Sequence, residues 1–297
     1  MRVGSVDHKE LFCRTFFEGH EKYEPADLAW PELNEEELQL LRSLPFWTHA
    51  LQFESDAGPM IRQVAALEND LMLREALELQ AYEEERHARL VQHAIDRYEL
   101  PHDPPKDVPI PDPIREFTQF GFDECLDSFG AFGLFALARD AKLLPDGIFQ
   151  IFGNVMREES HHIVFFINWY AHRQTNLGST ERALRPVRSV WHYGKALLEI
   201  ADLVKDDGAE DGADFIVTGA QAFVDDLTPQ KVIHACVTEN EWRMARFDRR
   251  LLLPRLVPTL AAAAGATLRL LPERSVAWFT GDSGSKTDPS ERTPRAA

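Results

Sequence analysis

Two short stretches of the chain decide how the rest of it is interpreted. They read Tyr82-Glu83-Glu84-Glu85-Arg86-His87 and Met156-Arg157-Glu158-Glu159-Ser160-His161-His162. Each offers Glu-x-x-His, and residues three apart on a helix share a face, so the carboxylate and the imidazole can bind one metal ion. A single acidic run of this kind is usually a solvated helix face. Two copies on separate helices favour a metal site.

The sequence around these motifs predicts an all-α protein. Strand signals are weak, and long segments rich in Ala, Leu, Glu, Gln and Arg carry apolar residues at three- and four-residue spacing. The pattern predicts four long helices, over residues 45–68, 71–98, 113–141 and 147–173. One Glu-x-x-His falls on the second helix and the other on the fourth.

The segment between the second and third helices cannot be helical, because residues 99–112 contain five prolines. An extended polyproline path through this segment would span roughly 43 Å. A helix of about 25 residues is roughly 38 Å long. The segment can therefore run the length of the bundle and start the third helix beside the second, although a compact turn is also open.

Two further glutamates lie level with the Glu-x-x-His motifs if each helix pair forms an antiparallel hairpin. Glu54 and Glu84 are equally distant from Asn69, in the most turn-like stretch between them. Glu124 and Glu158 are equally distant from Ala141, just before the next helix break. Apolar residues flank each of these glutamates at helical spacing, which predicts that the carboxylates are buried.

The expected burial of four carboxylates is the main physical reason for a dinuclear site. A lone buried carboxylate costs several kcal/mol unless it is paired or neutralised. Two divalent cations would balance four negative charges. The predicted ligands are Glu54, Glu84, His87, Glu124, Glu158 and His161. No thiolate is among them, and mixed oxygen and nitrogen ligation suits iron or manganese.

The fourth helix leaves a second register open, in which Glu159 and His162 form the Glu-x-x-His pair. At the same 34-residue offset the level partner of Glu159 is Cys125, which is not a carboxylate. We therefore favour Glu158 with His161 from the sequence.

The pattern Glu54, Glu84-x-x-His87, Glu124, Glu158-x-x-His161 resembles that of the ferritin-like di-iron carboxylate superfamily, over residues 45–173. The resemblance implies a ferritin-like four-helix bundle with two iron ions, manganese being the alternative. It is closer to the oxygen-activating branch than to storage ferritins.

In the oxygen-activating branch an Asp often precedes a Glu-x-x-His and hydrogen-bonds a metal-bound histidine. The corresponding positions here hold Glu83 and Arg157. Glu83 can serve as such an outer partner, whereas Arg157 cannot accept a hydrogen bond. Asp127, one turn after Glu124, is a substitute candidate.

We expect four regions along the chain. Residues 1–44 are predicted as an irregular N-terminal segment with one short helix capped by Asn34. Residues 45–173 form the di-metal bundle. Residues 174–275 add helices packed on the bundle, one of them beginning at Thr228-Pro229. Residues 276–297, rich in Ser, Thr, Pro and charge, are predicted to be disordered.

The composition of the chain argues against some classes of binding partner. A net charge of −17 disfavours nucleic acid and anionic lipid, and no membrane span is expected. Three widely spaced cysteines are interpreted as buried apolar residues and suit a reducing, cytoplasmic location.

These observations favour an oxidoreductase that uses dioxygen, a small-molecule substrate and an external electron donor, with a homodimer as one expected assembly. Two alternatives stay open: a ferroxidase or peroxide-detoxifying metal-handling protein, and a non-enzymatic helical interaction protein.

Overall fold

The computed structural model describes residues 1–44, 46–206 and 228–268, and all secondary structure in these ranges is helical. The elements are α1 (Val6–Gly19), the 3₁₀ turn η1 (Pro25–Asp27), α2 (Glu35–Ser43), α3 (Trp47–Leu67), α4 (Leu71–Tyr98), α5 (Pro113–Asp140), α6 (Asp146–Asn176), α7 (Ser179–Asp206), α9 (Pro229–Met244) and α10 (Leu256–Leu268). The predicted all-α class is confirmed for the described residues.

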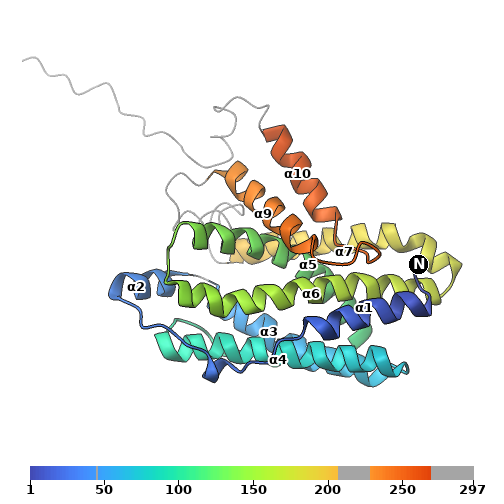
Figure 1. Ribbon diagram of the computed structural model, residues 1–297, viewed down its shortest axis with the longest axis horizontal. Helices are drawn as coiled ribbons and strands as arrows, with labels where there is room; N and C mark the ends of the chain where they lie inside the picture. Colours follow the sequence, from blue (N-terminus) through green and yellow to red (C-terminus); the bar gives the residue numbers. More distant parts are fainter. Residues whose placement is uncertain (45, 207–227, 269–297) are drawn as a thin grey trace, which may run out of the picture.

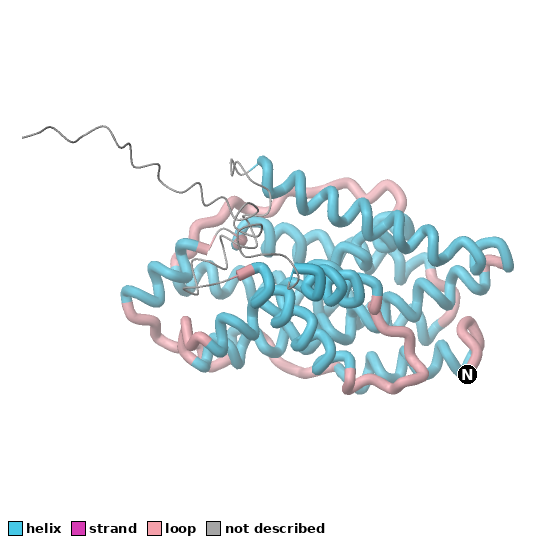
Figure 2. Tube along the Cα trace, turned by 90° about the horizontal axis from the view of Figure 1, so that it is seen from above, coloured by secondary structure: helices cyan, strands magenta, loops and turns pink. Residues whose placement is uncertain are grey.

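The helices form a bundle around two hairpins, α3–α4 and α5–α6 (Figure 1). The hairpins pack through α3 against α5 and through α4 against α6. Helix α1 lies along α4 and α6, α7 packs on α5 and α6, and α9 packs on α5. Seen from above, the described part of the chain consists of helices joined by loops (Figure 2). All four helices predicted to carry the metal ligands therefore belong to this bundle.

Local side chains set where the bundle helices begin and end. Asp70 caps α4 by accepting hydrogen bonds from the backbone N–H groups of Met72 and Leu73. Helix α4 ends at Tyr98, and the residue after it, Glu99, has a left-handed φ of 53°. Asp112 caps α5, with Pro113 in the first turn, where the missing N–H costs nothing.

The proline-containing segment 99–112 has no helix and runs beside α3. The Asp103 N–H donates to Thr48 Oγ1 at 2.9 Å, and the Lys106 N–H donates to Gln52 Oε1 at 2.8 Å. Gln52 in turn donates to the Lys106 carbonyl at 2.9 Å. Two consecutive turns of α3 thus hold the segment along the bundle. The third bundle helix, α5, packs on α3 rather than beside α4, where the extended path was expected to start it.

The N-terminal region is more ordered than we expected from the sequence. The short helix capped by Asn34 is present as α2, with a complete capping box. The prediction of an irregular segment before it was wrong, because α1 occupies residues 6–19. Ser5 caps α1, and Phe12, Cys13 and Phe16 form a buried stripe on it.

The C-terminal region contributes helices that pack on the bundle. Thr228 caps α9 and Pro229 opens it, as predicted. Helix α9 approaches α5 so closely that a Cβ on Gly133 would lie 2.6 Å from the backbone of Cys236. The disorder predicted for residues 276–297 concerns residues outside the described ranges.

The main core joins α1 to the bundle helices. Its largest fully buried side chains are aromatic, among them Phe12, Phe117, Phe165, Phe166 and Trp169. The three cysteines are buried and unpaired, in agreement with their interpretation as apolar residues.

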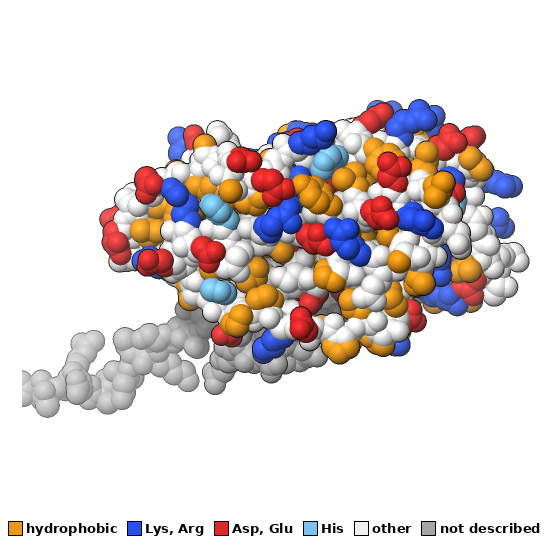
Figure 3. All heavy atoms as spheres, turned by 90° about the horizontal axis from the view of Figure 1, so that it is seen from below, with side chains coloured by type: hydrophobic (Ala, Val, Ile, Leu, Met, Phe, Trp, Pro, Cys, Tyr) orange, Lys and Arg blue, Asp and Glu red, His pale blue; other side chains and the backbone are white. Residues whose placement is uncertain are grey.

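Among the described residues, no helix combines the length and apolarity needed to cross a bilayer. The face drawn in Figure 3 carries acidic and basic side chains interspersed with apolar ones.

Replacing Gly133 by alanine should destabilise the protein by about 1–3 kcal/mol, because the new methyl group would overlap the α9 backbone. The matched control is Gly130→Ala on the same helix, where an added Cβ meets nothing within 4 Å. That variant should be stabilised by about 0.5–1 kcal/mol through helix propensity. Denaturant unfolding measures both. Equal stabilities would contradict the close packing of α9 on α5.

Candidate metal centre

Six acidic and histidine side chains from four helices converge inside the bundle. Helix α4 supplies Glu84 and His87, α6 supplies Glu159 and His162, α3 supplies Glu54 and α5 supplies Glu124. One ligand atom from each of Glu84, His87, Glu159 and His162 lies within 4.8 Å of the others. These four are buried, and Glu54, with a side chain 15% exposed, is the most accessible of the six.

The His87 imidazole faces three carboxylates with one nitrogen. Its Nδ1 lies 3.1 Å from Glu159 Oε1, 3.6 Å from Glu54 Oε2 and 3.7 Å from Glu84 Oε2. None of these pairs has the geometry of a hydrogen bond, and His87 Nδ1 and Glu54 Oε2 are buried without a hydrogen-bond partner.

The His162 imidazole repeats this arrangement on the other side of the cluster. Its Nδ1 lies 3.1 Å from Glu84 Oε1, 3.5 Å from Glu124 Oε1 and 3.7 Å from Glu159 Oε2. His162 Nδ1 and both oxygens of Glu124 are buried without a hydrogen-bond partner. Glu84 and Glu159 therefore reach both imidazoles, while Glu54 faces His87 and Glu124 faces His162.

These distances fit cations between the side chains. Two donor atoms that each lie about 2.1 Å from one ion, at right angles, are roughly 3 Å apart. Buried polar atoms without partners are rare in proteins and call for an unplaced ion or water. Here the buried atoms without partners belong to the two histidines and to two of the carboxylates, and they face one another. These atoms match the donor set of two divalent metal ions.

In the metal-free protein, protons balance the same charges. Burial lowers the pKa of His87 and His162, but the surrounding carboxylates outweigh it and hold both values well above normal. Burial raises the pKa of Glu54 to about 8, and that of Glu124 also lies well above normal. The same two imidazoles lower the pKa of Glu84 and Glu159, although burial acts to raise it.

The structure contradicts the register that we favoured for the fourth helix. Glu159 and His162 lie in the cluster, whereas Glu158 and His161 do not offer ligand atoms to it. Successive helical residues are about 100° apart, so a shift of one residue changes which side chains face the bundle interior. Glu54, Glu84, His87 and Glu124 come together as the sequence suggested.

A signal for the correct register was present in the sequence. The run Glu83-Glu84-x-x-His87 on α4 is repeated on α6 only as Glu158-Glu159-x-x-His162. The hairpin-level test favoured Glu158 and His161, but the two registers differ by a single residue, which is within the accuracy of that test.

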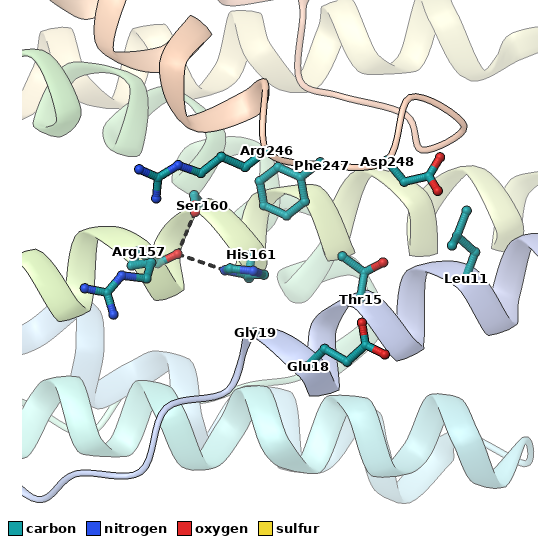
Figure 4. A pocket seen from close by; sticks show the side chains of 10 residues that line it. All are labelled: Leu11, Thr15, Glu18, Gly19, Arg157, Ser160, His161, Arg246, Phe247 and Asp248. Atoms are coloured by element: carbon teal, nitrogen blue, oxygen red, sulfur yellow. Dashed lines mark hydrogen bonds between the residues drawn. The ribbon is translucent and has the colours of Figure 1, made fainter.

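His161 points away from the metal cluster, into a hollow of about 420 Å³ on the other side of α6 (Figure 4). Its Nδ1 donates to the Arg157 carbonyl at 3.0 Å. The ring packs directly on Gly19 at the end of α1, where a Cβ would come within 2.3 Å of it. Phe247 contacts the ring from above, with centroids 5.0 Å apart.

The outer nitrogens of both cluster histidines are held by carboxylates. His87 Nε2 donates to Glu158 Oε2 at 2.8 Å, and His162 Nε2 donates to Glu83 Oε2 at 2.9 Å. Each of these carboxylates directly precedes a cluster glutamate. Such hydrogen bonds fix the tautomer that leaves Nδ1 free for a metal and raise the basicity of the imidazole.

Glu83 was expected to accept a hydrogen bond from a histidine of the cluster, and it accepts one from His162 Nε2. Arg157, which cannot accept a hydrogen bond, precedes Glu158. In the register that the structure shows, the residue that precedes the cluster glutamate Glu159 is Glu158, whose carboxylate can accept one. Asp127 is half-buried on α5, and the outer positions for which it was considered are taken by Glu83 and Glu158.

Comparisons with models of protein families, with curated proteins and with solved structures return no match. The assignment of the centre rests on the geometry described above.

Two alanine variants test the register. His162→Ala should lose tight binding of at least one of two manganese or cobalt ions per chain, because it removes a facing Nδ1. His161→Ala should bind both ions like the wild type, since that ring faces the opposite side of α6. Metal analysis after equilibrium dialysis measures both, and the reverse pattern would restore the rejected register.

Metal affinity should rise with pH across the neutral range. Each of the four groups with a raised pKa, the two imidazoles with Glu54 and Glu124, holds a proton at lower pH that an ion must displace. The dependence should flatten for Glu54 once the pH exceeds about 8. Calorimetric titration with manganese in buffers of different ionisation enthalpy reports the protons released. A metal affinity that stays constant between about pH 6 and about pH 8 would contradict this protonation pattern.

Proposed function

We propose that this protein is a di-iron oxidoreductase that activates dioxygen to oxidise a small organic substrate. The observation that carries the proposal is the buried cluster in which two imidazole Nδ1 atoms each face three carboxylates without hydrogen bonds. Two ferrous ions held there would supply electrons to dioxygen.

The donor set supports iron, with manganese as the alternative. Four carboxylates and two neutral imidazoles offer oxygen and nitrogen atoms only, which suits these metals better than a thiolate-preferring one. Two divalent ions balance four carboxylates, so a centre of zero net charge can persist in an apolar interior. A closed structural zinc site would need only four ligands.

The surroundings keep bulk water from most of the cluster. Phe16 on α1 packs against the His162 ring, with centroids 5.9 Å apart. Phe53 on α3 and Phe120 on α5, the helices that supply Glu54 and Glu124, stack with their ring centroids 4.9 Å apart. The partial exposure of Glu54 supports access for dioxygen and substrate from the α3 side. A dry site with one accessible side suits oxidation chemistry, because water competes for reactive species.

The structure argues against one of the two alternative functions and is compatible with the other. A purely structural interaction protein would display its acidic runs to solvent, whereas Glu83, Glu84, Glu124, Glu158 and Glu159 are buried. A ferroxidase would share the same centre. It differs in its product, since it would oxidise ferrous iron repeatedly and need no organic substrate.

Anaerobic loading with ferrous iron followed by oxygen tests the proposal. The wild type should retain about two iron ions per chain after desalting and consume oxygen with a transient absorption change. Glu84→Ala should lose both properties, because Glu84 reaches both imidazoles. The matched control is Glu85→Ala, whose carboxylate pairs instead with Arg62 on the surface.

Three results would count against the proposal. Iron that washes out of the wild type, or oxygen that is not consumed, would remove the oxidase assignment. Continued oxidation of excess ferrous iron, together with assembly into a large closed shell on size exclusion, would establish the ferroxidase instead. Circular dichroism of Glu84→Ala confirms that a loss of iron is not a loss of fold.

A further inference from the structure

The metal centre has a third layer of side chains that comes from the N-terminal part of the chain. Residues 20–24, which follow α1 and are named here the N-terminal strap, lie against α4 and α6. His20 Nδ1 donates to Glu83 Oε1 at 2.6 Å. The Tyr23 hydroxyl donates to Glu158 Oε2 at 2.9 Å. Each outer carboxylate thus receives one further donor from the strap.

Arg86 fixes the strap in place from within the bundle. Its side chain is fully buried, and one terminal nitrogen donates to the Glu21 carbonyl at 2.7 Å. Its guanidinium lies over the Tyr23 ring, 4.0 Å from the centroid. The other terminal nitrogen donates to Glu158. The strap is therefore positioned by the same arginine that binds one of the two outer carboxylates.

The two outer carboxylates consequently differ in their partners. Glu158 accepts from His87, from Tyr23 and from the cationic Arg86. Glu83 accepts from His162 and His20, while Arg86 stays 3.9 Å away. A carboxylate that already accepts a charge-assisted hydrogen bond has less electron density to offer another donor. Glu158 should therefore polarise His87 less than Glu83 polarises His162.

We propose that Arg86, together with the N-terminal strap that it holds, makes the two metal positions unequal, so that the position of His162 and Glu124 binds its ion first and more tightly than the position of His87 and Glu54. His20 and Tyr23 are positioning residues in this arrangement, each acting on one histidine through one carboxylate. The inference rests on the proposed metal centre and adds an order of filling to it.

Stepwise titration of the metal-free protein with cobalt(II), followed by proton NMR in water, tests the order. Each cobalt-bound imidazole gives its own strongly shifted, exchangeable Nε2–H resonance. One resonance should appear with the first equivalent and the second only with the next, with dissociation constants differing by about tenfold or more.

The variants should act on different resonances. His20→Ala removes the second donor to Glu83, so it should shift the first resonance, tighten the first ion and widen the gap between the two affinities. His20→Asn should restore the wild-type behaviour, because the amide nitrogen can replace Nδ1. Tyr23→Phe keeps the ring, removes the hydroxyl donor, and should shift the second resonance while narrowing the gap between the two affinities. The control is Tyr82→Phe, which loses a comparable hydrogen bond to Glu24 in the strap but has none to a carboxylate of the centre.

The outcomes separate this inference from the proposed function. Two cobalt ions that bind with equal affinity, or resonances unchanged in both His20→Ala and Tyr23→Phe, would overturn the inequality and leave the metal centre intact. A Tyr82→Phe effect as large as that of Tyr23→Phe would assign the change to general loosening of the strap, and would also overturn it. Failure to bind cobalt at all would remove the centre and the inference together.

Discussion

The burial of four carboxylates around two imidazoles constrains everything else in this structure. In an apolar interior such charges must be compensated within a few ångströms, by protons or by metal ions. The helices meet this requirement by placing Glu84 and Glu159 where each reaches both histidines. In the outer layer Arg86 lies near Glu83 and Glu158 and offsets part of their negative charge. The cluster is thus a set of mutually dependent charges, and the bundle is the frame that keeps them in register.

Much of this frame could be predicted from the chain because it depends on local patterns. Helical periodicity, caps such as Asn34 and Thr228, and the prolines after Glu99 act within a few residues, and the corresponding elements lie where they were expected. The ligands Glu54, Glu84, His87 and Glu124 followed from counting residues away from a hairpin turn. That count is accurate to about one residue. This identifies the helical turn on which a ligand lies, but one residue is a rotation of about 100°, so it does not identify the face of the helix. The choice of Glu158 and His161 failed for this reason.

The rest of the centre could not be found by local reasoning. His20 and Tyr23 contact carboxylates 63 and 135 residues further along the chain, and neither is part of a recognisable motif. Their positions follow from the packing of α1 against α4 and α6, which depends on the whole fold. His161 illustrates the converse: it has the spacing of a ligand, yet its environment is set by Gly19 and Phe247 from opposite ends of the sequence.

The division of the ligands between two hairpins has a thermodynamic consequence. Each hairpin carries one Glu-x-x-His pair and one further glutamate, and each histidine also faces a carboxylate of the other hairpin. Neither half can complete a metal position alone, so ions that bind only the assembled bundle would favour assembly by mass action. Docking of one half on the other thereby becomes coupled to metal supply. If the centre binds metal as proposed, removal of the ions should lower the free energy of unfolding of the whole bundle.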